Sequence, residues 1–136
     1  MLDVVRDMGD LPTDNTAYTA IQGVFQSFRA RLTPEQGIAF AGVLPAIPRA
    51  IFVAGWDIGA RPRPFGTRAE MTAEAQALRQ HHNLSRGNVI RAVSIATWRL
   101  VDHRDFARVL NSIGPQAQAF WTVEDAHPDE LARRII

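Results

Sequence analysis

The stretch "TPEQGIAFAGVLPAIPRAIFVAG", residues 33–55, decides the fold of this 136-residue chain. Thr33 can cap a helix, the proline after it suits the first helical position, and Gln36 completes a capping box. Two later prolines end that helix and redirect the chain. A shorter helix over about 47–54 is expected to end at Gly55, because glycine commonly follows a helix. The first helix should carry Ile38, Phe40, Ala41, Val43 and Leu44.

Helical spacing continues on both sides of this stretch. Upstream, apolar residues recur at the intervals of one helix face. Downstream, Thr67 and Glu70 form a second capping box, which opens a helix that runs to about His82. The upstream stripe comprises Ile21, Val24, Phe25, Phe28 and Leu32, and the downstream helix should be buried through Met71, Ala75 and Leu78.

Further helices are expected in the second half of the chain. One begins at Ser85, and another is capped by Asp102 and ends at the Gly-Pro pair of residues 114–115. A short helix then runs to Trp121, and a tail helix follows Pro128. No segment has convincing strand character, so the fold class is all-α. The expected core includes Phe28, Phe40, Leu44, Phe52, Val93, Ile113 and Trp121.

Two similar segments of the sequence suggest an internal duplication. "FAGVLPAI" at residues 40–47 returns as "FARVLNSI" at residues 106–113, an offset of 66. An offset of 69 aligns more of the architecture, including the caps Thr33 and Asp102, and a three-residue difference preserves the helix face. The pairing of Arg29 with Trp98 at this offset argues against a duplication.

The predicted organisation is one domain made of two similar helical-bundle halves. The first half covers about 1–56, a linker covers 57–66, and the second half covers about 67–122. The remaining residues, 123–136, form the tail helix. The linker "DIGARPRPFG" has two glycines and two prolines and should be exposed and mobile.

Composition excludes several functions. The chain has no cysteine, so disulfides and thiolate chemistry are absent, and all fifteen basic residues are arginine, which removes lysine chemistry. No signal peptide or membrane-spanning run is found, which predicts a soluble bacterial cytoplasmic protein. No nucleophile–base set is found, so we expect no enzyme and no cofactor.

No convincing metal or acid–base site emerges from the polar clusters. His81 and His82 are adjacent on an expected helix and point about 100° apart, so they do not converge on one ion. Asp102 is better explained as a cap than as a partner of His103, and the acids around His127 suit the start of the tail helix.

The best binding candidates are Trp56, Arg61 and Arg63, in and beside the linker. Trp56 either caps the core of the first half or contacts a partner, since aromatic and arginine residues are favoured at interfaces. Arg61 and Arg63 flank a proline that favours extended backbone, so their guanidinium groups can reach carboxylates or phosphates. Alternatively, they merely pair with Asp57 or Glu70.

The middle of the chain is basic. Residues 58–108 carry nine arginines and four acids, while the formal net charge of the whole chain is +1. These arginines lie on no single stripe and no helix-turn-helix signature is present, so nucleic acid is not the expected partner. The arginines considered for that role are Arg79, Arg86, Arg91 and Arg99.

The run "FRARLTPEQGIAFAGVLPAIPRAIFVAGW", residues 28–56, resembles a bacterial family known as domain of unknown function 2267. The run "IGPQAQAFW", residues 113–121, is similar to that family's second repeat, although Val43 and the Ile113–Gly114 pair depart from its pattern. The resemblance covers most of residues 14–122. It implies a small all-helical protein with two related halves, and it implies no activity, cofactor or catalytic residue.

The function expected from these observations is a non-catalytic protein-interaction or scaffold module with an unidentified protein partner. The alternative is a binder of an anionic ligand or nucleic acid that uses the arginine-rich middle. The sequence leaves the oligomeric state open.

Overall fold

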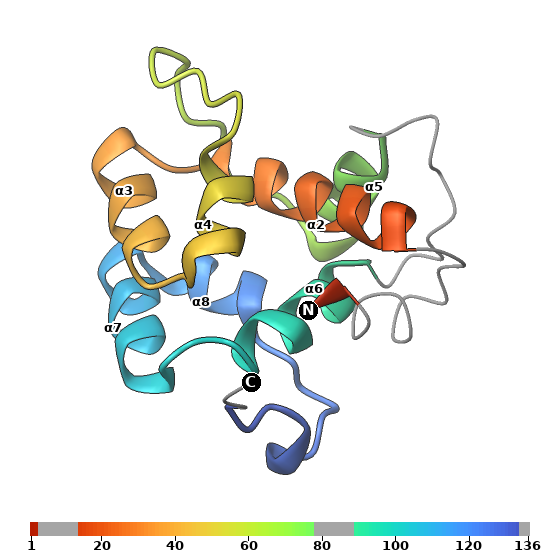
Figure 1. Ribbon diagram of the computed structural model, residues 1–136. Coiled ribbons are helices and arrows are strands. Elements are labelled where there is room, and N and C mark those ends of the chain that lie inside the picture. The colour runs from red at the N-terminus through yellow and green to blue at the C-terminus, as the bar shows by residue number, and fades with distance from the viewer. Residues whose placement is uncertain (3–13, 78–88, 134–136) are drawn as a thin grey trace.

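The computed structural model describes residues 1–2, 14–77 and 89–133, and within these ranges the regular structure is helical throughout (Figure 1). Leu78, the predicted helix end at His82 and the predicted helix start at Ser85 fall outside the described residues. The helices, labelled as in Figure 1, are α2 (Asp14–Arg29), α3 (Pro34–Gly42), α4 (Ala46–Val53), α5 (Arg68–Ala77), α6 (Val89–Trp98), α7 (His103–Ile113) and α8 (Pro115–Trp121).

The predicted helix starts rest on the predicted caps. The Thr33 hydroxyl accepts the Gln36 N–H at 3.2 Å, and the Gln36 side chain accepts the Thr33 N–H at 2.9 Å. Thr67 and Glu70 make the same reciprocal pair before α5. Asp102 accepts the Asp105 N–H at the start of α7. These three caps confirm the sequence analysis because each satisfies backbone donors that a helix start leaves free.

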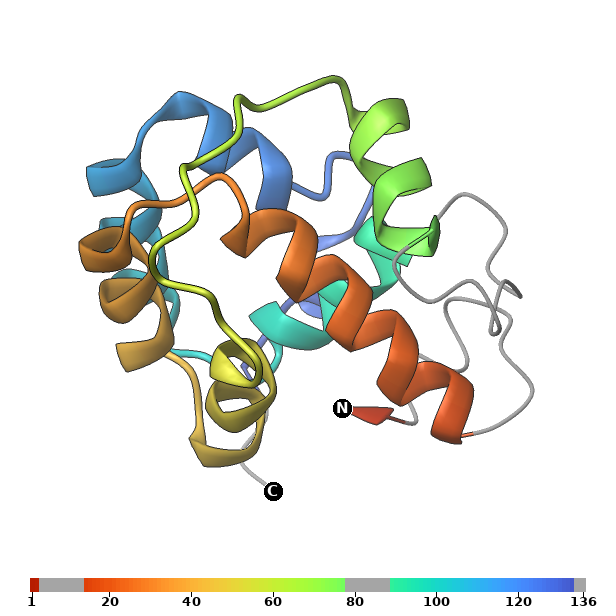
Figure 2. The ribbon, with the colours of Figure 1, turned by 90° about the horizontal axis from the view of Figure 1, so that it is seen from above.

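The helices pack around a cluster of aromatic side chains. α2 contacts α4, α5 and α6, while α3 contacts α4 and α7. In Figures 1 and 2, α3 and α7 lie together at one end of the molecule, α5 lies at the other end, and α2 runs between them. The fully buried rings are Phe25, Phe28, Phe40, Phe52, Phe106, Phe120 and Trp121.

Three sequence predictions about burial and length are wrong. Val43 and Leu44 lie beyond α3, which ends at Gly42, because the chain leaves the helix in a tight turn before Pro45, although Leu44 is still buried. Ile113 is only partly buried, since it is the last residue of α7. The tail helix is a single 3-10 turn at Pro128–Glu130, and the described chain beyond it, through residue 133, is not helical.

The linker crosses the molecule between α4 and α5 and passes the connection from α2 to α3 (Figure 2). The Arg63 N–H donates to the Ala30 carbonyl at 2.8 Å, and Phe65 lies with its ring centre 6.2 Å from that of Phe28. Residues 57–64 are exposed, as predicted. The linker is therefore exposed at its surface and attached to the core at two points.

Candidate functional site

The structure brings the three predicted binding residues together. Trp56, Arg61 and Arg63 line one pocket of about 190 Å³, and Arg29 and Asp57 line it with them. We call it the Trp56 pocket. It lies where α2 and α4 end and where the linker begins, so elements far apart in the sequence form its walls.

Trp56 both covers the core and lines the pocket. Gly55, with a positive φ of 66°, turns the chain after α4, a conformation that glycine adopts without steric cost. The Trp56 indole then lies against Gly37 of α3, where a Cβ atom would overlap the ring. Its ring centre is 6.2 Å from that of Phe52, and the side chain remains partly exposed. The face of the Trp56 ring that lies against Gly37 and Phe52 therefore covers the core, which is one of the two roles considered for Trp56 from the sequence.

Arg63 is tethered through a carboxylate that the sequence analysis did not select. Its Nη1 donates to Glu74 Oε1 at 2.9 Å, whereas Asp57 and Glu70 make no ion pair with it. Arg31 donates to both oxygens of Glu74, at 2.8 and 2.7 Å, and the Arg31 side chain is 4% exposed. Hydrogen bonds from Arg31 hold the pKa of the Glu74 carboxyl below its ordinary value. Two guanidinium groups thus share one carboxylate.

Arg29 stabilises the end of α4. Its Nη1 donates to the carbonyls of Phe52 and Ala54, at 2.8 and 3.0 Å, and thereby satisfies acceptors that a helix end leaves free. Burial lowers the pKa of Arg29, which still remains charged at neutral pH. Its Nε and Nη2 groups donate to no other described residue, and Arg61 makes no hydrogen bond or ion pair within the described ranges.

The Trp56 pocket therefore has an excess of positive charge. Three guanidinium groups and one carboxylate line it, which leaves two formal positive charges. Including Arg31 and Glu74 keeps the excess at two. A partly enclosed surface with unbalanced charge of one sign attracts ligands of the opposite sign.

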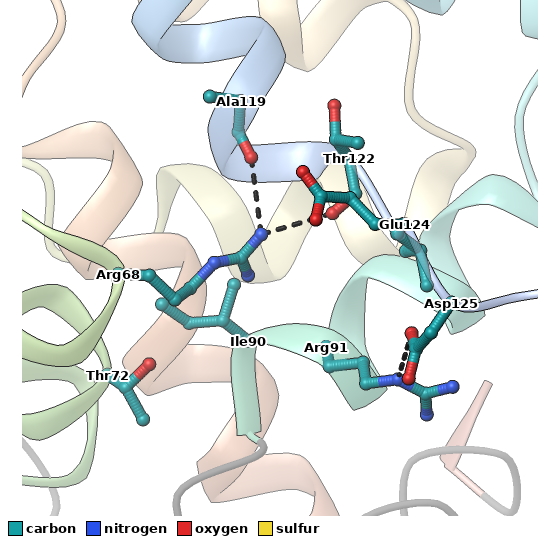
Figure 3. Close-up of a pocket in the computed structure, with 9 residues that line it drawn as sticks. Arg68, Thr72, Ile90, Arg91, Ala119, Thr122, Glu124 and Asp125 are labelled. Atoms are coloured by element: carbon teal, nitrogen blue, oxygen red, sulfur yellow. Dashed lines mark hydrogen bonds and ion pairs between the residues drawn. The ribbon is translucent and has the colours of Figure 1, made fainter.

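A larger pocket, of about 640 Å³, lies between α5, α6 and α8, but its charges balance (Figure 3). Arg68 donates to the carbonyls of Ala119 and Thr122, at 3.2 and 3.1 Å, at the end of α8. Burial lowers the pKa of Arg68, and the nearby Glu124 opposes that shift.

The remaining charges of this larger pocket also pair. Arg91 meets Asp125 at 3.0 Å, and this contact holds the pKa of Asp125 below its ordinary value. Two arginines and two carboxylates line the pocket. Because each arginine already has protein partners, we interpret this arrangement as structural.

An apolar groove of about 780 Å³ lies beside α2 and α4. Tyr18, Ile47 and Ile51 line it together with the first two residues of the chain, and Ile47 is 72% exposed. Nothing in the structure identifies an occupant for this groove.

The polar clusters discounted in the sequence have structural roles where they are described. His103 Nε2 lies 2.8 Å from the Trp98 carbonyl, and His127 accepts the Asp129 N–H at the 3-10 turn. In the ranges that the structure covers, no three His, Asp or Glu side chains gather as a metal ion would require. His81 and His82, with Arg79 and Arg86, lie outside the described residues.

Sequence reasoning missed Arg29, Arg31 and Glu74 as members of the charged cluster around the pocket. The only available signal was the position of Arg29 and Arg31 near the end of a helix, where cations are favoured. Glu74 lies 43 residues from Arg31, and no spacing rule links two residues so far apart.

The fold and the Trp56 pocket define a small all-helical protein with a cationic surface pocket. The family model of uncharacterized conserved proteins named DUF2267 matches residues 1–120, and the chain belongs to this family. The match confirms the identification made from residues 28–56. No curated protein matches the chain. In the described part of the chain, no helix combines the length and hydrophobicity needed to cross a membrane.

Proposed function

We propose that the protein is a non-catalytic protein-interaction module whose contact surface is the Trp56 pocket and the adjoining linker. The observation that carries the proposal is that Trp56, Arg61 and Arg63 line the same surface pocket. Tryptophan and arginine dominate binding energy at many protein interfaces. Ile58, which is 62% exposed on the same loop, adds an apolar contact beside the charges.

The state of the nearby carboxylates favours binding over catalysis. Asp57 Oδ1 accepts the Gly59 N–H at 3.0 Å, and Glu74 is shared by two arginines. A general base works best with a pKa near the operating pH, whereas Arg31 lowers that of Glu74. A role in recognition therefore needs fewer assumptions than acid–base chemistry.

Affinity capture with quantitative mass spectrometry tests the proposal. The wild-type protein is compared with the double variant Arg61→Ser/Arg63→Ser and with Arg104→Ser/Arg108→Ser, which removes the same charge from exposed positions on α7. A partner retained by the wild type and the α7 variant, and lost by the linker variant, is expected. Equal recovery with all three proteins, at matched folded fractions, would contradict the proposal.

The alternative function, anion or nucleic-acid binding across the arginine-rich middle, has less support. Arg91 pairs with Asp125, and Arg99 donates to the Glu130 carbonyl, so two of the candidate arginines hold the C-terminal segment. Salt-dependent retention on heparin or DNA, undiminished by substitution of Arg61 and Arg63, would favour this alternative.

We also propose that α2–α4 and α6–α8 are a diverged internal duplication at the 69-residue offset. Three matched boundaries support it: the ends of α2 and α6, the caps of α3 and α7, and the starts of α4 and α8 are each 69 residues apart. The matched helices also contact each other, α2 with α6 and α3 with α7. An experimental structure in which Phe40 superposes on Phe106 rather than Val109 would instead support the 66-residue offset.

A further inference from the structure

We infer that the Trp56 pocket receives a side-chain carboxylate from an acidic segment of the protein partner. This inference rests on the proposed function and adds the chemistry of the ligand. Three features of the pocket lead to it: its unused donors, the helix ends that form its walls, and its size.

The unused donors belong to Arg29 and Arg61. Arg29 uses only Nη1 for the α4 carbonyls, and Arg61 makes no hydrogen bond within the described ranges. The guanidinium group presents its N–H groups in a planar fork that matches the two oxygens of a carboxylate. Because Arg29 is already oriented by Phe52 and Ala54, less rotamer freedom is lost when it binds a ligand.

The helix ends favour a carboxylate over a phosphate. α2 ends at Arg29 and α4 ends at Val53, so both helices present their C-terminal ends near the pocket. A helix C-terminus carries a partial negative charge of about half an elementary charge, whereas phosphate sites typically use helix N-termini. Neither helix end therefore presents the free backbone N–H groups of a typical phosphate site. The donors come from guanidinium groups, whose planar fork matches the two oxygens of a carboxylate.

The size of the pocket sets the extent of the ligand. A volume of about 190 Å³ corresponds to roughly six water molecules at their share of liquid volume. This volume suits a carboxylate with its methylene groups. Ile58 is exposed and follows Asp57, which lines the pocket, so an apolar residue next to the acid has a surface to contact.

Nuclear magnetic resonance titration tests the inference. The probe is a ten-residue peptide of alternating Glu and Leu, and its control has Gln in place of Glu. Inorganic phosphate and a single-stranded oligonucleotide serve as the other arms. The reporters are the Trp56 indole N–H and the Nε–H signals of Arg29 and Arg61, which lie in the pocket.

The Glu peptide is expected to shift these three signals, while the Gln peptide and phosphate leave them unchanged at the same concentration. Arg61→Gln should weaken the Glu peptide at least tenfold, and it should fold normally because Arg61 is exposed. Arg108→Gln on α7, also exposed, should leave the affinity unchanged. No shift with the Glu peptide, or an equal or larger shift with phosphate or the oligonucleotide, would overturn the inference.

The capture experiment separates failure of this inference from failure of the proposed function. If the Glu peptide does not bind but a partner is still lost on Ile58→Ser, the loop is a contact surface that uses apolar groups alone. If neither the peptide nor any partner depends on the loop, both proposals fail.

Discussion

The first region of the molecule, α2–α4, and the second region, α6–α8, make the same hydrogen bond with different side chains. Arg29, the last residue of α2, donates to the Phe52 carbonyl at 2.8 Å. Trp98, the last residue of α6, donates through Nε1 to the Trp121 carbonyl at 2.7 Å. Both donors and both acceptors are 69 residues apart. The pair that argued against a duplication in the sequence therefore makes equivalent hydrogen bonds in the structure.

The two regions differ in where the rest of the donor side chain lies, against the core for Trp98 and at the surface for Arg29. The Trp98 ring packs on Phe106 with ring centres 4.7 Å apart, so the second region turns its donor toward the core. The position that matches Phe106 is Gly37, on which Trp56 lies from outside. The first region consequently keeps a charged guanidinium group and a tryptophan at its surface. We relate this asymmetry to binding by the first region only.

The largest expected effect comes from the core that the two regions share. Phe40 lies within 5.5 Å of four aromatic rings, measured between ring centres, and two of them, Phe106 and Trp121, belong to the other region. Phe40→Ala should lower the free energy of unfolding by about 3–5 kcal/mol. Chemical denaturation should show one transition for the whole chain. A loss below about 1 kcal/mol would show that the two regions do not share this core.

The next effect comes from the charged cluster beside the Trp56 pocket. Glu74→Gln leaves the charge of Arg31, whose side chain is 4% exposed, without its carboxylate, and should cost about 2–3 kcal/mol at pH 7. Arg63→Gln should cost less, because that side chain is 58% exposed. Equal losses in urea denaturation would contradict a burial-dependent role of Glu74.

Glu74 should also shape the dependence of stability on pH. Its pKa is lower in the folded chain than its ordinary value of 4.5, so the ionised carboxyl stabilises the fold above about pH 4.5. That contribution is lost as the pH falls below 4.5 toward the folded-state pKa. Melting temperatures measured from pH 7 to pH 3 should therefore fall less steeply for Glu74→Gln than for the wild type. Parallel curves would show that Glu74 contributes nothing to the acid sensitivity.

A smaller effect tests how Trp56 is positioned. Gly37→Ala places a methyl group against the indole and should displace the ring outward, at a cost of about 1–2 kcal/mol. Tryptophan fluorescence should shift to longer wavelength as Trp56 enters water. Gly42→Ala, where nothing lies near the added Cβ, is the matched control. A variant with unchanged fluorescence would show that Trp56 does not depend on Gly37.

The smallest predicted loss of stability concerns the cap of α3. Thr33→Ala removes the acceptor for the Gln36 N–H and should cost about 1 kcal/mol. Thr33→Ser, which keeps a capping hydroxyl, should restore most of it. If the serine variant is as unstable as the alanine variant, the hydroxyl is not the stabilising group.

Short-range sequence patterns predicted the starts of the helices, whereas the residues of the Trp56 pocket are brought together by contacts between distant segments. The caps at Thr33, Thr67 and Asp102 were predictable because each depends on residues three apart. The tail helix was also predicted from short-range patterns, yet only one 3-10 turn forms. Arg99 donates a hydrogen bond to the Glu130 carbonyl in that turn. Tertiary contacts overrode local preference at that point.

The Trp56 pocket was predictable only in part. Trp56, Arg61 and Arg63 stand close together in a segment rich in proline and glycine, so their composition indicated a surface loop. The positions of Arg29 and Glu74 depend on how α2 and α5 pack, and Gly23 allows the Ala75 backbone to approach α2 closely. No local pattern in the sequence encodes that approach.

The most direct test of the asymmetry compares Arg29→Met with Trp98→Phe. Arg29→Met removes the hydrogen bonds to the carbonyls at the end of α4, and Trp98→Phe removes the hydrogen bond to the carbonyl at the end of α8. Each variant has an apolar side chain at the substituted position. Titration of both variants with the Glu–Leu peptide, at temperatures where both are folded, should show at least a tenfold loss of affinity for Arg29→Met and none for Trp98→Phe. Equal affinities for the two variants would contradict the account, because the guanidinium group of the first region would then have no role in binding.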